Sequence, residues 1–439
     1  MRTLNENLLA KYDQALAETD DLLATYYPGD RPVRQPIHTL YVPADRYTPD
    51  LPYQYGQQAL ELVEKHGGMR RLADDVLGSS LNAELRQQVA DAVVTKLNIE
   101  PIEDLRLDFE DGFGHRSDAE EDEWAEKAGR AIAQTWLTGA QESPKVSPTP
   151  FAGIRFKCFE QDTRRRALAT LDLFLYGLLD EYKKATGRYQ IPQELVLTLP
   201  KVTTVAQVEV MVAAAKEIEQ AYGLDEGTIK FEVQVETPQV IIAQDGTFEV
   251  SHVIKAGEGR VTSLHYGTYD YSASLGVAAA YQSMEHNVAD FAKDVMQVAI
   301  AGTGVHISDG STNILPIGDE EQVRAAWALH ARLVTRHLER GIYQGWDLHY
   351  AQLPTRFLAT FAFYRKGFAA AATRLDNYVH QKDSAIMDEP ATAKSLAAYL
   401  QRALSCGAVT GEEIEANAGV SLDQLAHLAR TGYMPKVNA

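Results

Sequence analysis

Eight short apolar runs alternate with long helical segments over most of this 439-residue chain. The runs are rich in β-branched and aromatic residues, and apolar residues recur with a period of about 3.6 in most of the segments between them. Strands that alternate with crossover helices lie parallel, and eight such units close most simply into a barrel. The sequence therefore predicts an α/β fold, a (β/α)8 TIM barrel, with a doubly wound open sheet as the alternative. The runs span residues 39–42, 105–109, 153–156, 195–199, 229–235, 261–265, 304–307 and 345–349.

Helix start signals and the unmatched ends of the chain give the domain organisation. Thr204-x-x-Gln207 and Asp319-x-x-Gln322 are capping boxes, and Thr237-Pro238 is typical of an N-cap followed by a first-turn proline. The predicted organisation is an N-terminal helical extension, a barrel with a helical insertion, and a C-terminal helical appendage suited to packing, a lid or a subunit contact. The boundaries are residues 1–35 for the extension, 36–382 for the barrel with its insertion at about 54–98, and 383–439 for the appendage.

The charge of the chain restricts its partners. Lys and Arg number 42 against 61 Asp and Glu, which gives a formal net charge of −19. That charge repels nucleic acids and anionic lipids, so neither is an expected partner. The chain has two cysteines, Cys158 and Cys406, no apolar core of a signal peptide near its start, and no uncharged apolar run of about 18 residues. We therefore expect a cytoplasmic protein, which would need a bound cation or arginines to hold an anionic substrate.

Ionisable residues follow seven of the eight runs, at the end where a barrel carries its active site. Any one of them is more often a helix cap or an ion-pair partner than a ligand. Together they indicate a functional rim. They are Asp108, Glu110, Asp111, Arg155, Lys201, Glu236, Asp270, Asp309 and His349.

Two of these carboxylates predict a metal site. Glu236 and Asp270 end consecutive strands, and neighbouring strands lie roughly 4.8 Å apart, which is close enough for one cation to bind both. Mg²⁺ prefers oxygen ligands and keeps water positions that a substrate can take, with Mn²⁺ as the alternative. Zinc is disfavoured because no histidine or thiolate accompanies the pair.

The ordered set of motifs resembles the metal-dependent lyases and aldolases that include the citrate lyase β-subunit, malyl-CoA lyase and the HpcH/HpaI-type aldolases of the phosphoenolpyruvate/pyruvate barrel superfamily. No single motif is specific, but all occur in the family's order over roughly residues 36–356. The motifs are Asp108-Phe-Glu-Asp111, Ile154-Arg155, Leu199-Pro-Lys201, Val235-Glu236-Thr237, Tyr266-Gly-Thr-Tyr-Asp270 with Ser274-Leu-Gly276, and Gly341–Gln352.

The resemblance implies a role for each matching residue. Glu236 and Asp270 would ligate Mg²⁺ or Mn²⁺, and Arg155 would face the carbonyl oxygen of a 2-oxo acid. Glu110 would hold a water molecule on the metal, and Asp111 stands where relatives place a base or its partner.

The same resemblance suggests how a substrate is bound. Backbone N–H groups near Gly267 would bind the substrate carboxylate, and we assign Thr268, Lys201 and Thr237 to the same pocket. Lys201 is also a candidate for a Schiff base, but the metal route offered by the carboxylate pair disfavours that chemistry.

The expected activity is an Mg²⁺-dependent carbon–carbon lyase or aldolase that cleaves or forms a hydroxy acid or 2-oxo acid through a metal-stabilised enolate. Departures from the family pattern at 36–39, 155–157 and Tyr350 leave a CoA thioester substrate in doubt. The alternatives are an acyl-CoA lyase, a malate-synthase-like condensing enzyme, and a non-catalytic barrel subunit for binding or assembly. We expect a small anionic substrate and a homo-oligomer.

One further pattern yields an expectation about two histidines. His330 and His337 lie on a predicted helix beside three arginines, Arg332, Arg336 and Arg340. We interpret this pattern as a solvated basic helix face rather than a metal or phosphate site.

Overall fold

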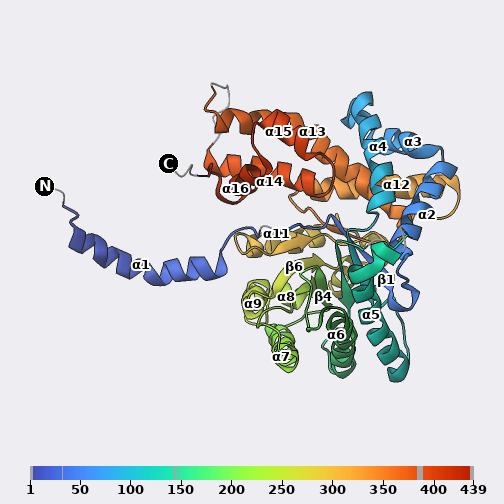
Figure 1. Ribbon diagram of the computed structural model, residues 1–439, viewed down its shortest axis with the longest axis horizontal. Coiled ribbons are helices and arrows are strands. Elements are labelled where there is room, and N and C mark those ends of the chain that lie inside the picture. Colours follow the sequence, from blue (N-terminus) through green and yellow to red (C-terminus); the bar gives the residue numbers. More distant parts are fainter. Residues whose placement is uncertain (1–2, 32, 143–144, 147, 383–388, 436–439) are drawn as a thin grey trace.

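The computed structural model describes residues 3–31, 33–142, 145–146, 148–382 and 389–435. Its centre is one parallel sheet in which the first seven strands each pair with the next along the chain and the eighth pairs with the first (Figure 1). The strands are β1 (His38–Pro43), β2 (Asp104–Asp108), β3 (Phe151–Arg155), β4 (Leu195–Leu199), β5 (Phe231–Val235), β6 (Val261–Tyr266), β7 (His306–Ser308) and β8 (Gly345–Asp347). All eight predicted strands are confirmed.

A short irregular seam joins β7 and β8 and closes the sheet into a barrel. Ser308 forms an isolated parallel bridge with Gln344. The Asp309 N–H donates to the Gln344 carbonyl oxygen at 2.8 Å, and the Trp346 N–H donates to the Gly310 carbonyl oxygen at 3.1 Å. The predicted TIM-barrel fold is therefore confirmed over the open-sheet alternative.

Helices cover the outside of the barrel, and their predicted start signals hold. Thr204 and Asp319 form capping boxes, and Pro238 is the first residue of α8 (Pro238–Ile241). The other helices of the barrel wall and rim are α5 (Asp118–Glu142), α6 (Arg164–Thr186), α7 (Val205–Tyr222), α9 (Glu249–Ala256), α10 (Thr268–Ser274), α11 (Asn287–Ile300), α12 (Glu320–Glu339) and α13 (Leu353–Val379).

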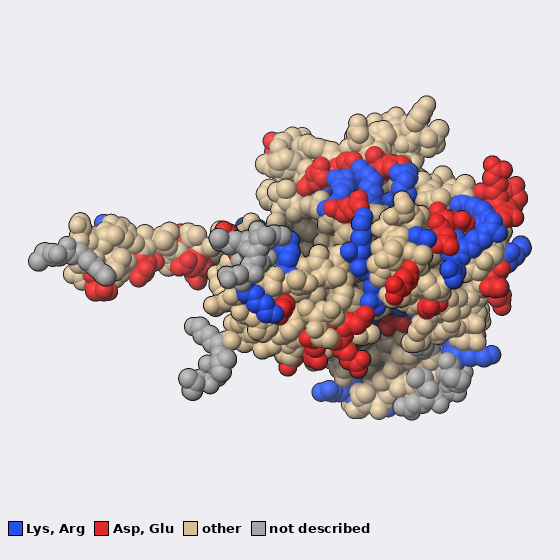
Figure 2. Space-filling model, turned by 90° about the horizontal axis from the view of Figure 1, so that it is seen from above, with Lys and Arg blue, Asp and Glu red and all other residues tan. Residues whose placement is uncertain are grey.

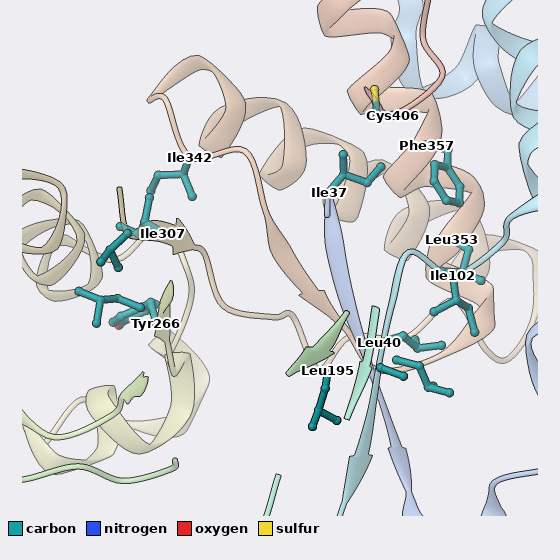
Figure 3. Packing of buried hydrophobic residues seen from close by; sticks show 14 of the residues in the cluster. Ile37, Leu40, Ile102, Leu195, Tyr266, Ile307, Ile342, Leu353, Phe357 and Cys406 are labelled. Atoms are coloured by element: carbon teal, nitrogen blue, oxygen red, sulfur yellow. The ribbon is translucent and has the colours of Figure 1, made fainter. Parts of the chain in front are cut away.

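Two groups of helices stand beside the barrel wall. The insertion after β1 forms α2 (Leu51–Lys65), α3 (Gly68–Leu77) and α4 (Ala83–Ile99), and the C-terminal helices are α14 (Pro390–Ser405), α15 (Gly411–Ala418) and α16 (Leu422–Thr431). Both groups pack against α13. Figure 3 shows Cys406, which follows α14, near Ile37 at the start of β1. The C-terminal helices therefore lie at the amino ends of the strands, opposite the charged rim.

The N-terminal helix α1 (Glu6–Tyr26) projects from the body of the protein (Figures 1 and 2). None of its residues is buried. Its apolar side chains are exposed, including Leu9, Leu16 and Leu23. Among the described residues, no helix combines the length and apolar character needed to cross a bilayer.

The apolar core lies between the strands and the surrounding helices, whereas the barrel interior is unusually polar. Figure 3 shows Leu40 and Ile102 beside Leu353 of α13 in the outer layer. Inside the barrel, buried Arg106 donates to Glu232 Oε1 at 2.6 Å and to Asp104 Oδ2 at 2.7 Å. TIM-barrel interiors are usually filled by branched apolar side chains, so this charged layer is a distinctive feature of the chain.

The expectation of a solvated histidine face on α12 is wrong. His330 and His337 are buried, because a spacing of seven residues places both on the helix face that packs inward. His330 Nε2 lies 3.1 Å from Asp347, and His337 Nδ1 lies 2.6 Å from the Ile342 carbonyl oxygen. The neighbouring arginines are on the outer face, where Arg332 pairs with Glu285 and both Arg336 and Arg340 pair with Asp290.

Candidate functional site

The loops after β2 and β4 and the helix α10 after β6 bring three carboxylates around one lysine. Lys201 Nζ donates to Glu110 Oε1 at 2.9 Å and to Asp111 Oδ2 at 3.1 Å. Asp270 Oδ2 lies 3.5 Å from the same nitrogen. These residues converge because parallel strands present all their carboxyl ends at one rim. The structure thus assembles the predicted residues, with Lys201 at their centre.

Glu236 lies at the bottom of this group and is almost fully buried. Its Oε2 accepts a hydrogen bond from the Lys201 backbone N–H at 3.1 Å, and its exposed fraction is 3%. No side-chain cation forms an ion pair with Glu236 within the described ranges. Burial, followed by repulsion from Glu110, raises the pKa of Glu236 to about 8. A cation beside Glu236 would therefore stabilise its ionised form.

The backbone at Gly267 approaches Glu236 too closely for any other residue. A Cβ atom at this position would lie 2.2 Å from Glu236 Cγ and 2.4 Å from Oε1. The Gly267 N–H donates to the Val235 carbonyl oxygen at 3.0 Å, so it belongs to the β5–β6 pairing and is not available to a substrate. Gly267 therefore makes room for the buried carboxylate.

Glu110 is the second carboxylate in a desolvated setting. Burial raises its pKa despite Arg155 and Lys201, and Asp111 raises it further. Its Oε2 is buried and makes no well-directed hydrogen bond, although Arg155 Nη1 lies 3.3 Å away. A buried carboxylate oxygen without a full partner is costly, and a bound cation, water or substrate would satisfy it.

Arg155 is held in place rather than left free at the rim. Its Nε and Nη2 donate to the two Asp108 oxygens at 2.7 Å each, and its guanidinium lies over the Tyr41 ring at 4.8 Å. Asp108 also accepts from the backbone N–H groups of Glu110 and Gly112. Burial alone would raise the pKa of Asp108, but Arg155 and these N–H groups outweigh it and hold the pKa below its ordinary value.

Lys201 adopts a backbone conformation that is uncommon for a residue with a side chain. Its φ of 49° lies in the left-handed region, and such strain tends to persist at functional sites. Burial lowers the pKa of Lys201, but Glu110 and Glu236 more than compensate and the pKa is raised. The amine is therefore held protonated, which opposes the Schiff-base alternative.

The remaining assigned residues, Asp111, Thr237 and Thr268, differ in how exposed they are and in whether their polar atoms already have partners. Asp111 is exposed, with 61% of its side chain accessible. The Thr237 hydroxyl donates to the Val202 carbonyl oxygen at 2.8 Å. Thr268 is buried, and its hydroxyl has no hydrogen-bond partner among the described residues. Of these side chains, Asp111 and Thr268 retain polar atoms that a ligand could engage.

Two strand-end residues do not join the group. Asp309 is buried and forms an ion pair with Lys293 at 3.0 Å, so the expectation that it faces the rim is wrong. His349 caps a short helical turn, where its Nδ1 accepts from the Ala351 N–H at 3.2 Å. Both side chains therefore stabilise local structure, Asp309 through Lys293 and His349 through the Ala351 N–H.

The donor set fits an oxygen-preferring cation at an open site. No group of three or more His, Cys, Asp or Glu side chains in the described ranges is placed so that it could hold a metal ion together. Mg²⁺ needs only one or two protein carboxylates, with water and substrate in the other positions. Five carboxylates face Arg155 and Lys201 here, which leaves an excess of negative charge: Asp108, Glu110, Asp111, Glu236 and Asp270.

Solved structures with the same fold support the resemblance found in the sequence. The chain is similar to a citrate lyase from Burkholderia xenovorans LB400, with a TM-score of 0.54 and 18% identity over 89% of this chain and 100% of that chain. It also matches malate synthase from Haloferax volcanii in a magnesium/glyoxylate complex, with a TM-score of 0.47 and 13% identity over 91% of this chain and 98% of that chain. Protein CitE from Mycobacterium tuberculosis, in complex with magnesium, acetoacetate and coenzyme A, has a TM-score of 0.45 and 15% identity over 89% of this chain and 100% of that chain. The similarity to the Burkholderia xenovorans structure shows that the chain shares the citrate lyase-like barrel fold.

Sequence comparisons give a family assignment. No curated protein matches the chain. The model of one family, described as a domain of unknown function (DUF6986), matches residues 16–432. That range includes the whole barrel and the C-terminal helices. The chain therefore belongs to the DUF6986 family, whose described function is unknown.

Proposed function

We propose that this protein is an Mg²⁺-dependent carbon–carbon lyase or aldolase that acts on a 2-oxo or hydroxy acid. The observation that carries the proposal is the buried Glu236 carboxylate, which lacks a side-chain counterion in the described structure and lies beside Lys201, Glu110 and Asp270 at the barrel rim. The citrate lyase-like fold places active sites at this rim and agrees with the proposal.

Glu236 and Asp270 are the residues that would hold Mg²⁺, or Mn²⁺ in its place. When bound, the ion supplies positive charge for the negative charge that develops on a carbonyl oxygen during carbon–carbon cleavage. Arg155 supplies a second positive charge at the same position. Asp108 and Tyr41 fix its guanidinium, so little reorganisation accompanies the reaction.

Glu110 and Asp111 would orient a water molecule and transfer protons. Glu110 has a raised pKa and a buried oxygen with an unfilled hydrogen-bonding position, which suits it to orienting a water molecule or sharing a proton. Asp111 is accessible from solvent and serves as the base or as its partner. Lys201 then pairs with a substrate carboxylate, in place of one of its present carboxylate partners.

Substrate positioning would involve the loops after β5 and β6. The unpaired Thr268 hydroxyl is available to a substrate oxygen, and Thr237 and Gly267 shape the wall of the pocket. Nothing in this arrangement favours a CoA thioester, so the second fragment of the substrate stays open, as does the direction of the reaction. The cytoplasmic location and the homo-oligomer remain predictions.

One observation favours a second candidate function, a non-catalytic barrel for binding or assembly. The Lys201 ammonium already contacts Glu110, Asp111 and Asp270, as it would in a purely structural ion-pair network. This alternative predicts that divalent ions do not stabilise the fold. Ligands that bind only the folded state raise the melting temperature, so a thermal melt with and without Mg²⁺ separates the two candidates.

The activity test compares Glu236→Gln with a matched control. Release of pyruvate or glyoxylate from a panel of hydroxy and hydroxy-oxo acids is measured with Mg²⁺ for the wild type, Glu236→Gln and Glu194→Gln. Glu194 is exposed and lies outside the group, so its variant should behave as the wild type. We expect turnover in the wild type and the control and its loss in Glu236→Gln. Equal turnover in all three proteins would contradict the proposed role of Glu236.

A further inference from the structure

A polar cavity lies at the end of the barrel opposite the rim carboxylates. Its volume is about 120 Å³, and it is enclosed by the segment that leads into β1, the start of β7, and the helices α14 and α16. The charged and imidazole side chains that line it are Asp30, Arg31, Arg34, His306, Arg402 and Arg430.

Arginines dominate the wall of this cavity, although the protein as a whole is acidic. Two of the four are already engaged: Arg34 pairs with Glu100 at 2.5 Å and Glu103 at 2.8 Å, and Arg31 Nη2 donates to a backbone carbonyl oxygen. Arg402 and Arg430 have no carboxylate partner in the part of the chain that the structure describes. Among the described residues that line the cavity, Asp30 is the only acidic one. The cavity therefore carries uncompensated positive charge.

His306 adds a polar atom that lacks a partner. Its Nε2 is buried and makes no hydrogen bond to any residue that the structure describes. Burial, with a contribution from Arg402, lowers the pKa of His306 to about 4, so the ring is neutral near pH 7. A neutral imidazole can donate from one nitrogen, and an anion in the cavity would provide an acceptor. Guanidinium groups without a carboxylate partner and an imidazole nitrogen without a hydrogen bond thus border the same space within the described residues.

The helices α14 and α16 contribute both arginines and small side chains to the cavity wall. Arg402 and Arg430 lie in the last turns of α14 and α16, where the helix dipole favours a basic residue. That preference accounts for each arginine separately but not for their convergence on one cavity. The adjacent lining positions are small, with Ala398 on α14 and Ala426 and Ala429 on α16. Larger side chains there would fill the space.

We propose that this cavity is a binding site for a small multivalent oxyanion, a phosphate group or a dicarboxylate, held by Arg402, Arg430 and His306. Guanidinium groups match the planar oxygen pairs of both anions. The volume accommodates several water-sized groups, which is the size of phosphate or a short dicarboxylate. The site lies at the amino ends of the strands, so it is separate from the carboxylate group at the carboxyl ends and independent of the proposed catalysis.

Isothermal titration of the full-length protein at constant ionic strength tests the proposal. Inorganic phosphate and succinate are titrated separately, with chloride as the control anion. Arg402→Gln and Arg430→Gln should each weaken binding by roughly 10- to 100-fold, as expected for the loss of a charge-assisted hydrogen bond. Ala426→Leu should abolish binding by filling the cavity without changing its charge. Arg332→Gln, on the outer face of α12, should bind as the wild type does.

The titrations can either support or overturn the oxyanion site. Saturable binding of either anion that weakens in the Arg402, Arg430 and Ala426 variants supports the site, and the tighter of the two anions identifies its chemistry. Absence of binding to the wild type, or binding that all three variants retain, overturns the proposal. Arg430 is exposed and makes no ion pair in the described structure, so its variant remains informative if Arg402→Gln, which loses a contact with Tyr343, fails to fold.

Discussion

Asp108 and Arg155 form a buried pair in which two parallel hydrogen bonds of 2.7 Å join carboxylate and guanidinium. The two residues end the adjacent strands β2 and β3, where they are register partners. Glu110 and Gly112 complete the hydrogen bonding of the carboxylate, and Tyr41 supports the guanidinium from one face. The pair fixes Arg155, which is the only arginine of the described structure that contacts the rim carboxylates.

Removing the charge of Asp108 should destabilise the fold. In Asp108→Asn the Arg155 guanidinium stays buried without a carboxylate that matches it, and loss of one partner of a buried pair costs about 3 kcal/mol. Asp294→Asn is the control, because Asp294 pairs with Arg340 at the surface and its loss should cost less than about 1 kcal/mol. Urea denaturation of both variants measures the difference. Equal free energies of unfolding would show that Asp108 contributes no more than a surface pair.

The stability of the protein should fall with rising pH because of Glu236. Burial raises its pKa in the folded state to about 8 from an ordinary value of 4.5. Between these values the folded protein holds a proton that the unfolded chain has released, so this contribution is complete below pH 4.5 and is lost as the pH rises through 8. The free energy of unfolding of the wild type should decline relative to Glu236→Gln by about 1 kcal/mol per pH unit across this window.

Mg²⁺ provides the control for this titration. The ion binds the ionised carboxylate, so its stabilising effect on the wild type should grow from pH 5 to pH 8 and should be absent in Glu236→Gln. Melting temperatures across this range with and without Mg²⁺ measure the effect. Parallel pH profiles in the two proteins would show that Glu236 titrates normally.

The barrel was predictable from the sequence because each strand has a local pattern of residues that identifies it. Each strand is a short run with apolar residues on the face that packs against the helices, and in β2 and β5 these alternate with polar residues that point into the barrel. The segments between the strands carry helical periodicity and caps at Thr204, Asp319 and Thr237. The rim position of Glu236 and Asp270 follows from the same pattern, since it depends only on where a strand ends.

The partners of these rim residues were less accessible to sequence reasoning. Lys201 contacts Glu110 across 91 residues of sequence, and a residue at a strand end gives no sign of which carboxylate it will meet. For Asp309 the position predicted from the sequence was wrong. Its place at a strand end predicts a side chain at the rim, but it forms a buried ion pair with Lys293 of the preceding helix. The burial of His330 and His337 was missed for a related reason: the arginines beside them dominate the local composition.

Deletion of residues 1–26 should leave the thermal stability of the barrel unchanged. The helix α1 within this segment contributes no buried residue, so its removal exposes no core surface. Melting temperature and molar mass by light scattering, compared with the full-length chain, measure the outcome. A melting temperature that drops by several degrees, or a change in oligomeric state, would show that the exposed apolar side chains of α1 are covered in solution.

Replacing Lys201 with Met should increase the affinity of the site for Mg²⁺. The variant retains a side chain of similar length but leaves Glu110, Asp111 and Asp270 without the ammonium that now neutralises them. The free energy of unfolding without metal should fall by about 1–3 kcal/mol, and Mg²⁺ should restore more stability than it gives the wild type. Lys216→Met is the control, because Lys216 pairs with Glu258 at the surface and far from these carboxylates in sequence. Titration calorimetry with Mg²⁺ measures the affinities, and equal values in the wild type and Lys201→Met would show that the lysine and the ion do not compete for the same negative charge.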